Sequence, residues 1–300
     1  MDLELVVPVV GTPLHATLSL PEGPPRAVAV TLHGASDGSR DQPLLAHAAK
    51  VLPQIGVAVL RFDRRGTADS VEIPFADQLA DLSHVVEVAT SECGGVPLVL
   101  WGFSQGGWIA TASAAALRPV ALVLVGFSAV TPAEQMRFGT DDHLRRAGFG
   151  CDDRAALEVL RRKYEAFQRG DLERASLQAQ LDEVADRPWF EFSWVPETAP
   201  DSPSWPDMDF DPAPSMATVP CPVLAFYGEQ DEWVPVGASV ARWHASLPEG
   251  QVTTMVLEGV RHHLFETESA GRQRPSNAYE RQMVSWLAAV LDARADGQRS

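Results

Sequence analysis

The chain has 300 residues and a formal net charge of −16, with 45% of its residues hydrophobic and 21% charged. This composition is typical of a globular protein with a large core, and the acidic excess disfavours nucleic acid and anionic membranes as partners. No apolar run reaches the roughly 18 residues of a membrane-spanning helix, and no secretory leader is recognisable. Three widely spaced cysteines disfavour a disulfide framework, so we expect a reduced, cytoplasmic protein.

Short apolar runs and amphipathic segments alternate along the first 125 residues. Residues 3–10 and 14–20 predict an opening pair of strands joined at Gly11-Thr-Pro13. Further strands are predicted at 27–32, 57–62, 96–101 and 120–125, and helices at 43–55, 76–91 and 108–117. Strands that alternate with helices predict a mostly parallel sheet that is covered on both faces.

The alternation stops at residue 131, and no buried strand is predicted from there to residue 218. Helical spacing of apolar residues predicts helices at 152–168 and 172–184, and residues 188–214 are rich in proline and aromatic side chains. Beyond this segment the strands resume at 222–227 and 252–257, and the helices at 236–246 and 277–295. We therefore predict a core of residues 1–130 and 219–300, with residues 131–218 inserted as a cap.

Gly102-Phe-Ser104-Gln-Gly106 stands between a predicted strand and a predicted helix. Strand, G-x-S-x-G and helix together are the pattern of a nucleophile elbow, a strained turn that exposes a serine hydroxyl at a helix N-terminus. Gly102 and Gly106 have no Cβ, so neighbouring chain can pack closely against such a turn. Ser104 is the predicted nucleophile, and the alternative is a glycine-rich turn whose serine has no chemical role.

A serine nucleophile needs a base beside it, and the base needs an orienting acid. Asp231 follows the predicted strand at 222–227, and His262 and His263 follow the strand at 252–257. Catalytic groups gather at the carboxyl ends of parallel strands, which favours Asp231 as the acid over a helix-capping aspartate. Neighbouring side chains on an extended segment diverge, so only one of the two histidines can be the base.

Two preorganised donors are needed for the oxyanion of acyl transfer. The N–H group of Gln105 directly follows the nucleophile, and we predict that Ala35, in the loop after the strand at 27–32, supplies the second. His33 is predicted to hold that loop by hydrogen bonds. The chain has no H-x-H, H-E-x-x-H, G-x-G-x-x-G or Walker A pattern, so we predict neither a metal nor a nucleotide cofactor.

Together these residues resemble the α/β-hydrolase superfamily. The matching motifs are His33-Gly34-Ala35, Asp63-x-Arg-Gly66, Gly102-x-Ser-x-Gly106-Gly107, Gly228-x-x-Asp231 and Gly259-x-x-His262. Within the superfamily, the chain is similar to dienelactone-hydrolase-like and prolyl-oligopeptidase-like serine esterases. The resemblance implies an α/β fold with an eight-stranded, mostly parallel sheet and a helical cap inserted after Val125.

The resemblance also bears on the choice of base. His262 lies three residues after Gly259, as the base does in many members, whereas a rival alignment takes His263-Leu-Phe as the motif. We prefer His262, so that the predicted triad is Ser104, Asp231 and His262.

The predicted function is that of a serine hydrolase, resembling carboxylesterases, that cleaves a small-molecule acyl substrate. Trp189 and Trp194 are predicted to contact an apolar acyl or aromatic group, unless they form the core of the cap itself. The same triad serves thioesterases, acyltransferases, peptidases and C–C hydrolases, and the alternative outside enzymes is a ligand-binding protein on this scaffold. Seven acidic residues between 186 and 215 disfavour a strongly anionic substrate such as a free coenzyme A thioester. Oligomeric state stays open between a monomer and a homodimer.

Overall fold

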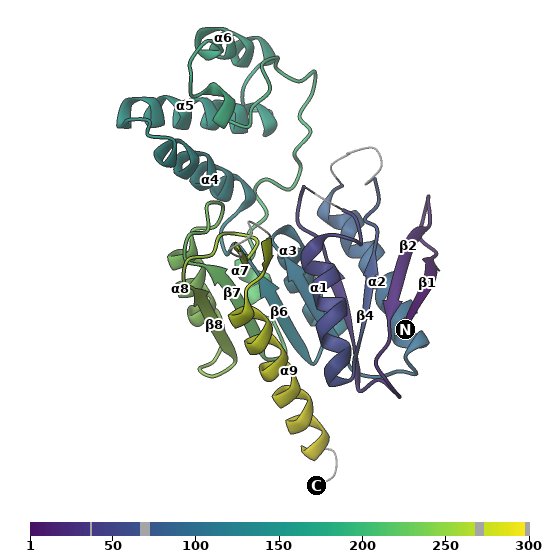
Figure 1. Cartoon of the computed structure of the whole chain (residues 1–300). Coiled ribbons are helices and arrows are strands. Elements are labelled where there is room, and N and C mark those ends of the chain that lie inside the picture. The colour runs from purple at the N-terminus through teal and green to yellow at the C-terminus, as the bar shows by residue number, and fades with distance from the viewer. Residues whose placement is uncertain (37, 67–72, 268–272, 298–300) are drawn as a thin grey trace. The chain divides into compact units, whose positions relative to one another are not determined.

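The computed structural model of the chain describes residues 1–36, 38–66, 73–267 and 273–297 (Figure 1). The chain divides into two compact units. We call them the core unit (Met1–Ala129, Pro212–Asp231 and Val236–Ser300) and the insert unit (Val130–Asp211 and Glu232–Pro235). Each unit buries a hydrophobic cluster of its own.

Among the described residues the core unit holds a sheet of eight strands in the order β1-β2-β4-β3-β5-β6-β7-β8. Their bounds are β1 (Asp2–Val7), β2 (Leu14–Ser19), β3 (Ala27–Leu32), β4 (Val57–Phe62), β5 (Leu98–Phe103), β6 (Ala121–Val125), β7 (Val223–Gly228) and β8 (Val252–Leu257). The pairs β1–β2 and β2–β4 are antiparallel, and all later neighbours are parallel. The predicted eight-stranded, mostly parallel sheet is therefore confirmed.

Helices cover both faces of this sheet (Figure 1). The core unit contains α1 (Pro43–Val51), η1 (Leu52–Ile55), α2 (Phe75–Glu92), α3 (Gln105–Leu117), α7 (Ala213–Met216), α8 (Val236–Ser246), α9 (Asn277–Gly297) and a short pair of strands, β9 (Phe265–Thr267) and β10 (Gln273–Pro275). The strands β3, β4, β5 and β7 are buried at every position, which explains why their sequences are apolar runs without alternation.

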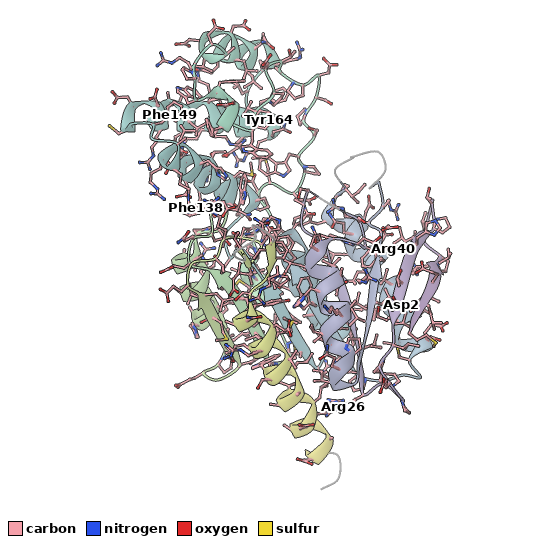
Figure 2. All side chains as sticks on the ribbon, viewed as in Figure 1. Asp2, Arg26, Arg40, Phe138, Phe149 and Tyr164 are labelled. Atoms are coloured by element: carbon pink, nitrogen blue, oxygen red, sulfur yellow. The ribbon has the colours of Figure 1, made fainter. Side chains whose placement is uncertain are left out.

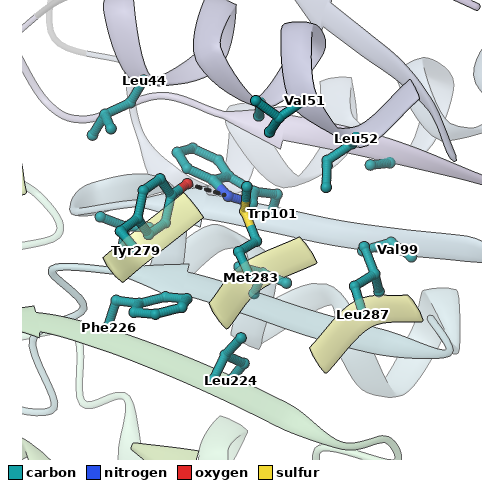
Figure 3. Close-up of a cluster of buried hydrophobic side chains, with 14 of the residues drawn as sticks. Leu44, Val51, Leu52, Val99, Trp101, Leu224, Phe226, Tyr279, Met283 and Leu287 are labelled. Carbon is teal, nitrogen blue, oxygen red and sulfur yellow. Dashed lines mark hydrogen bonds between the residues drawn. The ribbon is translucent and has the colours of Figure 1, made fainter. Parts of the chain in front are cut away.

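Figure 3 shows the cluster that α1, η1 and α9 form against one face of the sheet. Trp101 of β5 is fully buried there, and its indole Nε1 donates a hydrogen bond of 3.2 Å to the hydroxyl of Tyr279 in α9. Met283 and Leu287, one and two turns further along α9, are also fully buried. This packing anchors β5, the strand that ends directly before Ser104.

The insert unit contains α4 (Pro132–Arg146), α5 (Cys151–Gln168), α6 (Arg174–Val184) and η3 (Phe190–Phe192). Its core consists of Leu144, Leu157, Leu160, Phe167, Leu177, Leu181, Val184, Trp189, Phe190, Val195 and Ala199. Phe149 and Tyr164, both labelled in Figure 2, pack against this core and stay partly exposed. The two helices predicted for this segment are confirmed as α5 and α6. Within the described ranges, no helix is long and apolar enough to span a bilayer.

The bounds of the insert unit differ from the predicted cap of residues 131–218. Residues 212–218 belong to the core unit, because α7 packs against α3 and α8 and buries Met216 completely. Residues Glu232–Pro235 instead group with the insert unit. The Trp233 ring lies so close to α4 that a Cβ on Gly139 would clash with its Cε3 atom.

Candidate active site

The turn between β5 and α3 has the strained backbone that its glycine pattern predicts. Ser104 has a φ of 49° and a ψ of −116°, a conformation that costs a residue with a Cβ about 1–3 kcal/mol. A Cβ on Gly102 would lie 2.6 Å from the carbonyl oxygen of Gly106, and one on Gly106 would lie 2.6 Å from that of Leu32. Both positions require glycine because backbone atoms lie within 3 Å of where a Cβ would be.

The backbone of Ser104 is hydrogen-bonded to the end of β6. Its backbone N–H donates to the carbonyl of Val125 over 2.8 Å, and its own carbonyl accepts from Gly107 over 2.9 Å. Gln105 is the first residue of α3, so its N–H has no partner within the helix. The turn therefore holds the Ser104 side chain at the positive end of a 13-residue helix.

Asp231 and His262 come together at the carboxyl ends of β7 and β8. The His262 Nδ1 atom lies 2.9 Å from Oδ2 and 3.1 Å from Oδ1 of Asp231, and each residue is only 5% exposed. A carboxylate only accepts hydrogen bonds, so Nδ1 carries the proton and Nε2 is left as the basic nitrogen. The loop carrying His262 can approach β7 because Gly228 has no side chain, since a Cβ there would be 2.5 Å from the carbonyl of Val260.

His262 also lies at the end of β6, beside the residue that follows Val125. A Cβ on Gly126 would be 2.8 Å from the His262 Cε1 atom. The ring centroid of His262 is 5.2 Å from that of Phe103, the residue before Ser104. The fold thus brings Ser104, Asp231 and His262 to one edge of the sheet.

His263 is placed differently from its neighbour. Its side chain is exposed, and its ring stacks on that of Phe265 with centroids 6.1 Å apart and planes 13° apart. The ring planes of the two histidines are 88° apart. The histidine whose Nδ1 contacts Asp231 is therefore His262.

The loop after β3 lies directly beside the turn at Ser104. A Cβ on Gly34 would be 2.9 Å from the Phe103 ring and 3.6 Å from the Ser104 Cβ atom, so the peptide joining Gly34 to Ala35 is close to the serine. His33 is buried, and its Nε2 donates to the carbonyl of Phe62 over 2.5 Å. Burial, with a smaller contribution from the charge of Arg64, lowers the pKa of His33 to about 3. His33 is thus a neutral donor that holds the loop, as predicted.

The two tryptophans predicted to bind substrate lie in contrasting places. Trp189 is fully buried in the core of the insert unit, so we no longer assign it to substrate. Trp194 is 62% exposed, has a φ of +53°, and packs edge to face on Trp233 at 5.3 Å between centroids. The sequence did not single out Trp233, although it lies only two residues after Asp231.

Metal ligands do not gather anywhere in the part of the chain that the structure describes, where no group of three or more His, Cys, Asp or Glu side chains could hold an ion. The polar contacts of the site involve Arg64, whose individual contacts could not be predicted from the sequence. Its guanidinium joins the carbonyls of Gly34 and Ala35 to the side chain of Gln105. The Asp63-x-Arg-Gly66 motif was the one signal that pointed to this turn.

Comparison with known proteins gives both a family and a set of structural neighbours. The model of the alpha/beta hydrolase family matches residues 29–273. A solved proline iminopeptidase from Mycobacterium smegmatis is 19% identical with a TM-score of 0.61, over 97% of this chain and 99% of its own. A carboxyl esterase from Bacillus coagulans is 18% identical with a TM-score of 0.60, over 97% and 99% of the two chains. Both confirm the α/β-hydrolase fold.

A shorter likeness links the chain to curated relatives. The lysophosphatidylserine lipases ABHD12 of Macaca fascicularis and Mus musculus are 35% identical to it over 86 residues, which are 28% of this chain. The match spans only 21% of the length of these relatives.

Proposed function

Because the chain belongs to the alpha/beta hydrolase family, we propose that this hydrolase is a serine esterase that cleaves carboxylic esters through Ser104, His262 and Asp231. The observation that carries the proposal is the hydrogen-bonded pair of His262 and Asp231 at the sheet edge where the strained Ser104 turn lies. A strained backbone conformation such as that of Ser104 persists only where the surrounding structure enforces it.

In the proposed reaction, Ser104 Oγ attacks the ester carbonyl carbon while His262 Nε2 takes its proton. Asp231 accepts the Nδ1–H bond, which fixes the tautomer and stabilises the imidazolium. The carbonyl oxygen becomes an oxyanion that accepts hydrogen bonds from the N–H groups of Gln105 and Ala35. Collapse of the intermediate breaks the C–O bond, and His262 returns the proton to the leaving alcohol. A water molecule, deprotonated by His262, then attacks the acyl carbon. The bond to Ser104 Oγ breaks, His262 returns the proton to Oγ, and the acid is released.

An ester rather than a thioester is the proposed substrate class. Acidic side chains of the insert unit between residues 186 and 211 disfavour a polyanionic thioester carrier. The exposed ring of Trp194 favours an apolar acyl or aromatic group. Thioesterase, acyltransferase, peptidase and C–C hydrolase activity, and ligand binding without catalysis, are the alternatives that an experiment has to exclude.

A panel of p-nitrophenyl esters of increasing acyl length, measured beside acyl thioesters of coenzyme A, tests this proposal. We expect turnover of the esters, with kcat/KM at least about tenfold above that of the thioester with the same acyl chain. Lysophospholipids belong in the panel because of the name of the curated relatives. Turnover of thioesters alone, or of none of the acyl compounds, would contradict an esterase.

Trp194→Ala is expected to lower kcat/KM for long-chain esters by about tenfold, while the rate on the acetyl ester changes by less than about twofold. Removing an apolar contact worth about 1.4 kcal/mol causes a tenfold loss, and an acetyl group offers little apolar surface for such a contact. Val159→Ala is a matched control, because Val159 is also exposed on the insert unit, at 50%. An equal loss on every ester length would mean that Trp194 only supports the fold.

A further inference from the structure

Arg64 links the two backbone segments that the proposed mechanism uses to bind the oxyanion. It follows β4, and its backbone N–H is held by the carbonyl of Gly38 over 2.8 Å. The Nη1 atom donates to the carbonyl of Gly34 over 2.9 Å and to Oε1 of Gln105 over 3.0 Å. The Nη2 atom donates to the carbonyl of Ala35 over 2.8 Å. One planar guanidinium thus bridges the loop after β3 and the first residue of α3.

The contact with Gly34 fixes the direction of an N–H group. The carbonyl of Gly34 and the N–H of Ala35 belong to the same planar trans peptide, and they point to opposite sides of it. Arg64 on the carbonyl side therefore turns the Ala35 N–H away from the guanidinium. The contact with the Ala35 carbonyl fixes the next peptide as well, so the loop cannot rotate about Ala35 without losing a charge-assisted hydrogen bond.

The contact with Gln105 fixes the distance between the loop after β3 and the start of α3. Gln105 is 9% exposed, and its Oε1 accepts from Arg64 and, over 3.5 Å, from Nε2 of Gln78. Its backbone N–H is the other proposed oxyanion donor. A lysine cannot reproduce this bridge, because its single ammonium lacks the rigid fork that reaches three acceptors in one plane.

The charge of Arg64 adds to the effect that its hydrogen bonds have on the proposed oxyanion donors. A cation bound to a peptide carbonyl polarises that peptide and strengthens the N–H as a donor. The charge of Arg64 also contributes, after burial, to the lowered pKa of His33, which directly follows β3. A developing negative charge one peptide away from Arg64 is stabilised by the same field.

We propose that Arg64 is a positioning residue that clamps the loop after β3 to the start of α3 and so preorganises the Ala35 and Gln105 N–H groups for the oxyanion. This inference rests on the proposed serine esterase function. It assigns Arg64 an effect on the transition state alone, since a ground-state ester carbonyl is not yet charged.

The test compares Arg64→Met and Arg64→Lys with wild type on a short p-nitrophenyl ester. We expect kcat to fall by about 30-fold in Arg64→Met and about tenfold in Arg64→Lys, with KM within about threefold. The inhibition constant of a trifluoromethyl ketone, which forms a tetrahedral oxyanion on serine, should rise by the same factor as kcat falls. That of the corresponding methyl ketone should stay within about twofold.

Arg65→Lys is the matched control from the same turn. Arg65 binds Asp81 in α2 through two hydrogen bonds, of 3.0 and 2.5 Å, and we expect its variant to keep kcat and the trifluoromethyl ketone affinity within about twofold. Unchanged kcat in the Arg64 variants, a rise in KM alone, or equal losses in Arg64→Lys and Arg65→Lys would overturn the inference. If Arg64→Met does not fold, Arg64→Lys carries the test. Ester turnover that survives Ser104→Ala would instead overturn the proposed function.

Discussion

Replacing Ser104 with alanine is expected to lower kcat for ester hydrolysis by about 10⁴- to 10⁶-fold, because the proposed acyl intermediate forms on Ser104. The backbone of the turn should stay as it is, since the close contacts at Gly102 and Gly106 involve no atom of the Ser104 side chain. A fluorophosphonate probe should label wild type at Ser104 with one phosphonyl group per chain, and the variant not at all. Initial rates and the intact mass of the labelled chain provide both measurements.

Ser113→Ala is the control for this experiment. Ser113 is a buried serine on α3, and its hydroxyl bonds the carbonyls of Ile109 and Ala110 within the same helix. We expect this variant to keep its rate and its labelling within about twofold. Near-normal turnover in Ser104→Ala, or a phosphonyl group found on another residue, would refute the nucleophile assignment and the mechanism with it.

The eight-stranded sheet was predictable because its strands have a strong local signal, whereas the short strands β9 and β10 were not predicted. A buried parallel strand is an apolar run, and β3, β4, β5 and β7 all show one. The turn at Ser104 has a local signal too, since Gly102 and Gly106 are required by backbone contacts. Asp231 and His262 were predictable from their places after β7 and β8, because parallel strands bring their carboxyl ends to one edge.

Helix α4 was not predicted, although its sequence has a local signal for the start of a helix. Thr131 and Glu134 form a capping box at its start, with the Thr131 hydroxyl accepting from the Glu134 N–H. Its apolar periodicity is weak because much of the helix surface is charged. The start of α3 was also missed, since Gly106 and Gly107 disfavour a helix locally. Phe127 packs where a Gly107 side chain would be, which is a tertiary contact that propensity does not show.

The roles of Trp189 and Arg64 depend on contacts between distant parts of the chain. Nothing in the proline-rich segment distinguishes Trp189, which is fully buried, from Trp194, which is 62% exposed. Arg64 reaches Gly34 and Ala35, about thirty residues earlier, and Gln105, 41 residues later. Two of these acceptors are backbone carbonyls. Every residue has one, so the type of residue does not indicate such a contact. Such contacts become visible only when the register of β3, β4 and β5 is known.

His262→Ala is expected to lower kcat by about 10⁴-fold or more, whereas His263→Ala should keep it within about threefold. The difference follows from geometry, because His262 is buried with Nδ1 at 2.9 Å from Asp231 and His263 is exposed and stacked on Phe265. Without the imidazole, Ser104 Oγ has no group to take its proton, so labelling by the fluorophosphonate should also slow sharply. Loss of the His263 ring removes its packing on Phe103, Phe265 and the His262 ring, and it should leave the contact between His262 and Asp231 in place.

Rates and labelling of the two histidine variants, measured at the same pH and with thermal melting as the check on folding, decide between them. Asp231→Asn provides a third measurement, because it keeps the shape of the acid and removes the charge that holds the His262 tautomer. We expect it to lose about 10⁴-fold in kcat, as His262→Ala does, and to lose little more when the two changes are combined, since residues that act as a unit are not additive. An inactive His263→Ala beside an active His262→Ala would transfer the role of base to His263 and would require the segment after β8 to turn its other side chain toward Asp231.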